Sequence, residues 1–341
     1  MTANREHDSL DFLKLILSFM VAAIHSGLFF EHIYPAARLA VPAFFTLTGY
    51  FAFGKIDHAA SPELKKEILK KTIRRNLGLY FSWTILLFPL IYYMRGFLAM
   101  GISKGMPAML LSVMKGVSFV GSWYIFASVI ALAIVFLLSH FLSNGALLLL
   151  SLPFYLIGTA CAEFPFVYHV PILGKAIEAL SIPFGAPYFR YVIALLYIVM
   201  GKIIADQKGK QQSIMVSFVA FAVCAAGLQL EFLFVEKAVA SAYHRDCYLM
   251  LAPTAYFLVK FLERVPAHFP NAAAMRKLST ITYCTHGVVL AVVSKVLKIG
   301  NITDSSNIGL FLCTIAICSG IGVCILKLEQ KPGMAFLRCL H

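Results

Sequence analysis

Charged side chains are scarce in this sequence. Lys, Arg, Asp and Glu together make up 13% of its 341 residues, whereas a soluble domain contains about 25%. The hydrophobic fraction reaches 60%, and a water-soluble chain of this size could not bury so much apolar surface, because part of every domain faces water. The composition therefore excludes a soluble globular enzyme and a disordered chain, and it indicates a polytopic membrane protein.

Acidic residues are especially few. The chain has 16 Asp and Glu residues against 29 Lys and Arg, which gives a formal net charge of +13. The basic residues lie in short clusters between apolar runs, a pattern typical of membrane-orientation signals and of contact with anionic lipids. We therefore expect membrane lipids as partners, and no nucleic acid.

Several chemical signatures are also missing. The sequence contains no Walker-type phosphate loop, no G-x-S-x-G elbow and no H-E-x-x-H helix. Its eight cysteines form no C-x-x-C pair, and most of them lie inside apolar runs. We interpret them as small core residues, so neither a disulfide framework nor a metal site is predicted.

Ten apolar runs predict ten transmembrane helices, because each span needs about 20 residues. The chain is therefore expected to be an all-α polytopic membrane protein with one integral domain over residues 1–341. Acidic residues precede the first run, which favours a retained first helix over a cleaved signal peptide. The runs lie near residues 11–30, 38–54, 77–94, 122–140, 146–163, 188–205, 214–233, 247–263, 279–297 and 307–326.

The distribution of positive charge predicts the orientation. If the amino terminus is cytoplasmic, the inner segments hold eighteen of the Lys and Arg residues and the outer segments hold ten. This excess predicts that both termini are cytoplasmic, with an even number of spans. Segment 106–119 is interpreted as an interfacial or re-entrant piece.

The loop over residues 55–76 has a pattern of its own. Ser61 can cap a helix whose first residue is Pro62, and lysines surround a narrow apolar face. One interpretation is an interfacial helix that lies on anionic lipid headgroups. The other is a cytoplasmic surface that binds the phosphates of a soluble donor.

Ionisable residues within the first span are the most informative ones, since burying such a group in a membrane is costly. Lys14 and His25 are separated by 11 residues, so they project from the same helix face about 16 Å apart. His25 has a side chain suited to general-base catalysis; the alternative is a packing histidine. Lys14 fits either a functional cation or a side chain that extends to the interface.

A second unusual arrangement begins at Arg38, four residues before Pro42 in the next span. A proline there suggests a broken helix whose free backbone groups face a cavity. Arginine offers a rigid set of donors for carboxylate, phosphate or carbonyl oxygen. The alternative is an ordinary loop cation at the membrane edge.

Taken together, these residues resemble a known family. Asp11 followed by the K-x(10)-H spacing, and the motif R-x-A-V-P-x-F-F-x-L-x-G-Y, resemble the acyltransferase-3 family of bacterial integral membrane acyltransferases, which modify carbohydrates and related envelope components. Two later segments resemble it as well, the first with Trp123 and Tyr124 and the second with Ser279, Tyr283 and His286. Thr48 departs from the family's usual serine, and Lys14 stands where arginine is frequent.

The resemblance implies an acyl-CoA-dependent O-acyltransferase in the bacterial inner membrane. The acyl group, expected to be acetyl from acetyl-CoA, would move from the cytoplasmic donor to a hydroxyl of an envelope polysaccharide or a lipid-linked sugar, with no metal. By this resemblance His25 is the catalytic base. Arg38 would stabilise the oxyanion or bind a phosphate, and Lys14 would bind the phosphates of coenzyme A.

The resemblance also implies contacts for four aromatic side chains, although each has a structural alternative. Tyr283 and His286 would line the substrate cavity, or they pack helices together. Trp123 and Tyr124 would shape the acceptor groove, or they anchor the helix at the membrane interface.

Two other functions stay open. The first is a membrane transporter or uptake module for a small solute such as an amino acid, because membrane domains of this family occur fused to amino-acid racemases. The second is a structural subunit of a polysaccharide export system.

Overall fold

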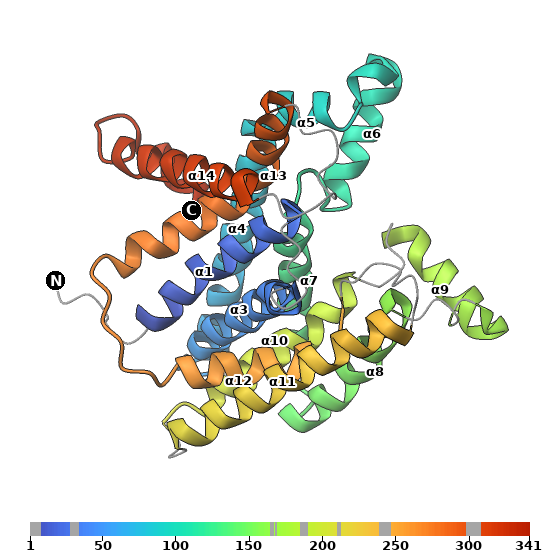
Figure 1. Ribbon diagram of the computed structural model, residues 1–341. Coiled ribbons are helices and arrows are strands. Elements are labelled where there is room, and N and C mark those ends of the chain that lie inside the picture. The colour runs from blue at the N-terminus through green and yellow to red at the C-terminus, as the bar shows by residue number, and fades with distance from the viewer. Residues whose placement is uncertain are drawn as a thin grey trace. The chain divides into compact units, whose positions relative to one another are not determined.

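The structure is a computed structural model (Figure 1). It describes residues 8–27, 34–163, 167, 169–184, 190–209, 213–238, 247–297 and 308–341. These residues form helices joined by turns and short irregular segments. No strand occurs among these residues, and the predicted all-α class is confirmed. The helices are α1 (Asp8–His25), α2 (Tyr34–Arg38), α3 (Ala40–Ile56), α4 (Pro62–Leu86), α5 (Phe88–Met94), η2 (Leu98–Met100), α6 (Ile102–Met114), α7 (Ser122–Leu138), α8 (Asn144–Glu163), α9 (Pro171–Phe184), α10 (Arg190–Asp206), α11 (Ile214–Ala238), α12 (Leu251–Leu262), α13 (Ala272–Val296), α14 (Ile308–Leu328) and η4 (Ala335–Leu340).

Each of the ten predicted apolar runs contains a helix. Within the described residues, four stretches are long and apolar enough to cross a membrane, or five if α4 and α5, which meet at 67°, cross as one. Two other predicted spans, α7 and α12, are apolar but have only 17 and 12 residues. The count of ten spans and the cytoplasmic termini therefore stay predictions.

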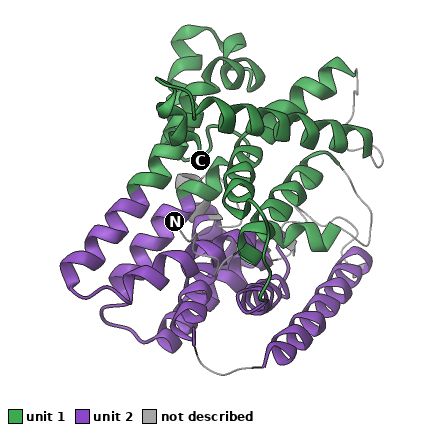
Figure 2. Ribbon diagram, turned by 90° about the vertical axis from the view of Figure 1, so that its left-hand side faces the viewer, with its two compact units in different colours: residues 1–40, 74–126, 266–341 green, residues 41–73, 127–265 purple. Residues whose placement is uncertain are grey.

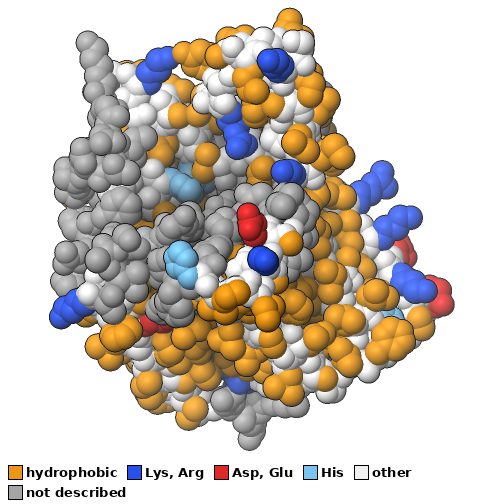
Figure 3. Space-filling view, turned by 90° about the vertical axis from the view of Figure 1, so that its right-hand side faces the viewer, with side chains coloured by type: hydrophobic (Ala, Val, Ile, Leu, Met, Phe, Trp, Pro, Cys, Tyr) orange, Lys and Arg blue, Asp and Glu red, His pale blue; other side chains and the backbone are white. Residues whose placement is uncertain are grey.

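The surface of α11 shows the membrane character most directly. Only 17% of the residues in its most apolar stretch are buried, and four of its outward side chains are between 64% and 68% exposed: Met215, Val223, Leu230 and Phe234. Hydrophobic side chains also cover much of the face drawn in Figure 3. A soluble protein does not expose so much contiguous apolar surface, whereas lipid solvates it.

The chain divides into two compact units built from interleaved segments (Figure 2). Unit 1 contains residues 1–40, 74–126 and 266–341, and unit 2 contains residues 41–73 and 127–265. Unit 1 thus joins the first helices of the chain to the last ones, while unit 2 holds most of the middle. The prediction of one integral domain over 1–341 stays a prediction.

One helix, α4, includes both the lysine-rich loop and the start of the next apolar run. It begins at Pro62, and the Ser61 hydroxyl accepts a hydrogen bond from the Leu64 N–H at 3.2 Å, which confirms the predicted cap. The helix then continues without a break to Leu86. The sequence predicts a change of element near residue 76. Asn76 and Gly78 are weak helix formers, but Lys, Arg and Leu favour the helix and no proline follows until Pro89, so the helix continues.

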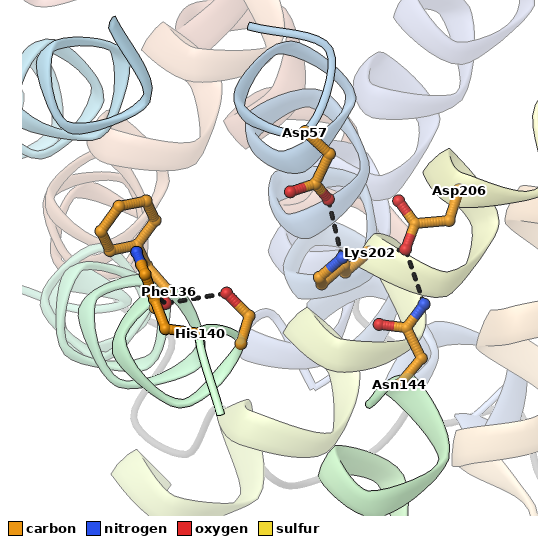
Figure 4. A network of polar contacts seen from close by, with 7 residues as sticks. Asp57, Phe136, His140, Asn144, Lys202 and Asp206 are labelled. Atoms are coloured by element: carbon orange, nitrogen blue, oxygen red, sulfur yellow. Dashed lines mark hydrogen bonds and ion pairs between the residues drawn. The ribbon is translucent and has the colours of Figure 1, made fainter. Parts of the chain in front are cut away.

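Unit 2 contains a polar network around Lys202 of α10 (Figure 4). The Lys202 ammonium donates hydrogen bonds to Asp57 at 2.7 Å and Asp206 at 2.8 Å, and the Asn144 amide donates to Asp206 at 2.6 Å. Burial, more than the neighbouring Asp206 carboxylate, raises the pKa of Asp57 above its ordinary value. The network joins the turn after α3 to α10 and to the start of α8.

The last helix, η4, is held to the rest of unit 1 by contacts of side chains. The Trp83 indole N–H donates to the Leu340 carbonyl at 3.1 Å, and Glu329 accepts hydrogen bonds from Lys277, at 2.7 Å, and from His341. Burial opposes the charged form of Glu329, but these hydrogen bonds outweigh it and hold the pKa of Glu329 below its ordinary value.

Two glycines bring the backbones of α3 and α10 into direct contact within unit 2. A Cβ at Gly49 would overlap the Ile198 carbonyl and lie 3.0 Å from its Cα. A Cβ at Gly201 would overlap the Thr46 carbonyl and lie 2.5 Å from the Tyr50 nitrogen. Such close backbone contact between helices requires small residues, as in other membrane helix pairs.

Alanine at either glycine should therefore separate the two helices. We expect Gly49→Ala and Gly201→Ala each to lower stability by about 1–3 kcal/mol through overpacking, measured as a fall in the thermal unfolding midpoint in detergent. Gly54→Ala on the same helix is the matched control, because its Cβ would meet only the Ala205 methyl at 3.8 Å. Equal midpoints for Gly201→Ala and Gly54→Ala would contradict this packing.

Candidate functional site

The first helix, α1, packs lengthwise against α13 in unit 1 (Figure 1). Residue numbers rise in the same direction on both, so the two helices are parallel. In the predicted topology they are the first and ninth spans, which both run outward, as a parallel pair requires. The contacts, from one end to the other, are Asp8 with His268 (2.9 Å), Phe12 with Phe269 (ring centroids 4.6 Å), Asp11 with Arg276 (2.9 Å), the Lys14 carbonyl with the Ser279 hydroxyl (2.7 Å) and His25 with His286 (ring centroids 5.1 Å).

The spacing of polar residues explains why these two faces meet. Steps of three and four residues place side chains on one side of a helix. Such steps link Asp11, Lys14, Ser18 and, through the apolar Val21, His25 on α1, and they link Arg276, Ser279, Tyr283 and His286 on α13. Each helix thus carries a polar stripe. Lipid offers these polar groups no hydrogen-bond partners, whereas the stripe of the other helix does, so the two stripes face each other.

An ion cluster lies where the two helices begin. Asp11 accepts a hydrogen bond from Lys14 through Oδ1 at 3.0 Å and from Arg276 through Oδ2 at 2.9 Å. The Asp11 side chain is 6% exposed and that of Lys14 is 16% exposed. Arg75 of α4 is near enough to act electrostatically on Lys14. Positive charge exceeds negative charge here, so the cluster is suited to an anionic group.

Arg276 is a site residue that the local sequence does not distinguish from the other cations predicted to lie on the inner side. Its position three residues before Ser279 and seven before Tyr283, on the same helix face, is the signal that could have identified it.

Two histidines lie near the other end of α1. His25 is its last residue and is exposed, whereas His286 of α13 is completely buried. The two rings are stacked at 29°. The Nδ1 atom of His286 lies 2.6 Å from the Tyr283 carbonyl, and its Nε2 atom is buried without a hydrogen-bond partner in the described residues.

Tyr283 connects this histidine pair to the start of α7. Its hydroxyl donates to the Gly121 carbonyl at 2.9 Å, and its ring packs against His286 at 5.9 Å and against Tyr124 at 5.5 Å. The late Tyr–His segment and the Trp–Tyr segment, both singled out in the sequence, therefore meet in unit 1. Trp123, half-buried, precedes Tyr124 on α7.

Arg38 is placed differently. It ends α2, which contacts α1, and the chain turns at Leu39 before α3 begins at Ala40. A one-residue turn thus separates two helices three residues before Pro42, although Tyr34–Ile56 as a whole is one of the stretches that are apolar and long enough to cross a membrane. That freed backbone groups face a cavity here stays a prediction. The Arg38 guanidinium donates to the Tyr34 hydroxyl, at 2.9 Å from Nε, and lies over the Tyr34 ring. These contacts keep Arg38 against its own helix, whereas the other candidate residues follow α1, α7 and α13.

No metal-like cluster accompanies these residues. Within the described ranges, no three His, Cys, Asp or Glu side chains gather as metal ligands would. What the arrangement offers is a cation cluster at one end of a polar seam and two imidazoles toward the other. These groups can bind an anion and transfer a proton.

Comparison with known proteins identifies the family of the chain. A family model described as an acyltransferase domain matches residues 7–328, nearly the whole chain. The chain belongs to the acyltransferase-3 family. Membership in this family indicates acyltransferase chemistry, and the apolar helices indicate a membrane protein.

A curated relative of this acyltransferase-3 chain is an amino-acid racemase of Enterococcus faecalis, with 24% identity over 348 residues. The match covers 95% of this chain and 46% of the racemase. The chain thus spans about half the length of that relative. No solved structure matches.

Asp11 is expected to be the most sensitive member of the ion cluster in this acyltransferase-3 protein. Asp11→Asn leaves Lys14 and Arg276 facing each other without a counter-charge, and we expect a loss of roughly 3 kcal/mol, the lower end for a broken buried pair. Arg276→Gln leaves the Lys14–Asp11 pair intact, and the Arg276 side chain is 48% exposed, so its loss should stay below about 1 kcal/mol.

Thermal unfolding in detergent measures both losses. The double variant Asp11→Asn with Lys14→Met removes a stranded cation and should recover part of the stability. Equal losses for Asp11→Asn and Arg276→Gln, or no recovery in the double variant, would contradict the central role of Asp11.

Proposed function

We propose that this protein transfers an acyl group, expected to be acetyl, from cytoplasmic acyl-CoA to a hydroxyl of an envelope carbohydrate or lipid-linked sugar in the bacterial inner membrane. The observation that carries the proposal is the polar seam between α1 and α13. It has surplus positive charge where α1 begins and a histidine pair where α1 ends.

The donor fits this seam by charge and by length. Coenzyme A carries several phosphate charges, and a long pantetheine arm separates them from the thioester. Lys14 and Arg276 offer charge-assisted hydrogen bonds to a phosphate. His25 lies 11 residues along α1 from Lys14, or about 16 Å, so an extended arm laid along the helix brings the thioester toward His25.

The reaction needs one base and one stabiliser of negative charge. In our proposal His25 removes the proton from the acceptor hydroxyl, and the resulting oxygen attacks the thioester carbonyl. The carbon–sulfur bond then breaks, and the coenzyme A thiolate takes the proton back from His25. Arg38 is assigned to the oxyanion or to a phosphate, and Trp123 and Tyr124 to the acceptor groove.

A second function is worth testing because of the relative's name. That protein is an amino-acid racemase, and this chain matches about half of it, so a membrane module that moves an amino acid is the alternative. Acetyl-CoA separates the two proposals. Stabilisation of the purified protein by acetyl-CoA supports the transferase, whereas amino-acid uptake into proteoliposomes without that stabilisation supports transport.

Replacing His25 should abolish transfer without preventing folding. We expect His25→Ala to insert normally and to lower acyl transfer by about 10²–10⁴-fold, the usual worth of a general base. The assay is the acyl content of envelope carbohydrate in cells that express the variant, with protein level as the reference. His58→Ala, also an exposed histidine, is the matched control, and full activity of His25→Ala would remove His25 from the mechanism.

Replacing Lys14 should affect the donor selectively. Lys14→Met removes a charge-assisted hydrogen bond worth about 1.5–3 kcal/mol, so we expect the KM for acyl-CoA to rise by roughly 10- to 100-fold. Lys14→Arg keeps the charge and should stay close to the parent protein. If Lys14→Met changes kcat alone, Lys14 does not bind the donor.

A further inference from the structure

The buried ring of His286 has a defined tautomer. Its Nδ1 atom lies 2.6 Å from the Tyr283 carbonyl oxygen, and a carbonyl can only accept a hydrogen bond, so Nδ1 carries a proton. In the neutral ring Nε2 then carries a lone pair and no proton. The ring is completely buried, and a second proton would place a charge there beside the His25 ring.

The Nε2 lone pair is therefore an acceptor that the described protein does not satisfy. A buried polar atom without a partner costs free energy, and a bound water, ion or ligand group is what satisfies such an atom in native proteins. Its position matters as well, because the ring stacks on that of His25, with centroids 5.1 Å apart. An acceptor at this point binds a hydroxyl or an amine, and it repels a carbonyl or phosphate oxygen.

This preference assigns His286 to the acceptor rather than to the acyl donor. A hydroxyl has only one proton, so the group that His25 deprotonates cannot also donate to His286. A second hydroxyl next to the first one can. Neighbouring hydroxyls on a sugar ring suit two imidazoles held this close together.

We propose that His286 binds, through Nε2, a hydroxyl adjacent to the one that receives the acyl group, so that the site selects sugars with two neighbouring hydroxyls. The proposal rests on the proposed function for the role of His25. Tyr283 acts as a positioning residue: its carbonyl sets the His286 tautomer, and its own hydroxyl is held by the Gly121 carbonyl.

Binding measurements test the proposal without requiring transfer. The probes are methyl hexopyranosides with two neighbouring hydroxyls and their monodeoxy forms, and the readout is thermal stabilisation of the full-length protein in detergent. We expect the parent protein to bind the diol probe at least about tenfold more tightly than its monodeoxy partner, since a site built around a hydroxyl rejects the analogue that lacks it.

Three variants separate recognition from packing. His286→Met fills similar space without an acceptor of comparable strength and should bind both probes equally. His286→Gln can place a carbonyl oxygen near the position of Nε2 and should restore the preference. His140→Met in unit 2 removes a histidine whose Nδ1 also lies near a carbonyl oxygen, that of Phe136 at 2.8 Å, and as the control it should keep the preference.

The outcomes are distinct. Equal binding of the two probes by the parent protein, or an unchanged preference in His286→Met, would overturn the proposal. A preference that is lost in His286→Met and regained in His286→Gln supports it. Release of coenzyme A from acetyl-CoA is measured separately: if the probe preference is present but His25→Ala releases coenzyme A at the parent rate, the assigned base fails while the hydroxyl site stands.

Discussion

The carboxylate of Asp11 is the interaction on which the candidate site depends. It joins Lys14 of its own helix to Arg276 of α13, two residues that 261 intervening positions separate in the chain. That bond sets the register between α1 and α13, and the register in turn decides that the Lys14 carbonyl meets Ser279 and that His25 meets His286. A buried carboxylate shared by two cations costs too much to leave unpaired, so the parallel arrangement of these helices is strongly specified.

Scarce charge makes each buried charge informative. In unit 1 the cations around Asp11 outnumber it, which suits a site for an anion. In the unit 2 network the carboxylates outnumber the cation, since Lys202 forms ion pairs with both Asp57 and Asp206. The groups of this second network satisfy one another across the turn after α3, the start of α8 and α10, and they hold these elements together. Close backbone contact at Gly49 and Gly201 does the same without any charge.

Much of the helix content was predictable, because composition and local pattern set it. All ten apolar runs contain helices, and Ser61 caps α4 as expected. Other features were not. The lysine-rich loop and the following apolar run form one helix, since no residue there stops propagation. Arg276 escaped notice because nothing in the local sequence distinguishes a cation that pairs across helices from one that faces water.

The sequence by itself determined that this is a helical membrane chain and that Lys14 and His25 share a face, since both follow from composition and from 3.6 residues per turn. It also carried the residues that resemble the acyltransferase-3 family. Only the tertiary structure decided which distant residues complete the site. The partners of Asp11, the ring beside His25 and the free lone pair of His286 all depend on α1 and α13 packing in parallel. That packing is set by complementary polar stripes more than 250 residues apart, and no local pattern encodes such a match.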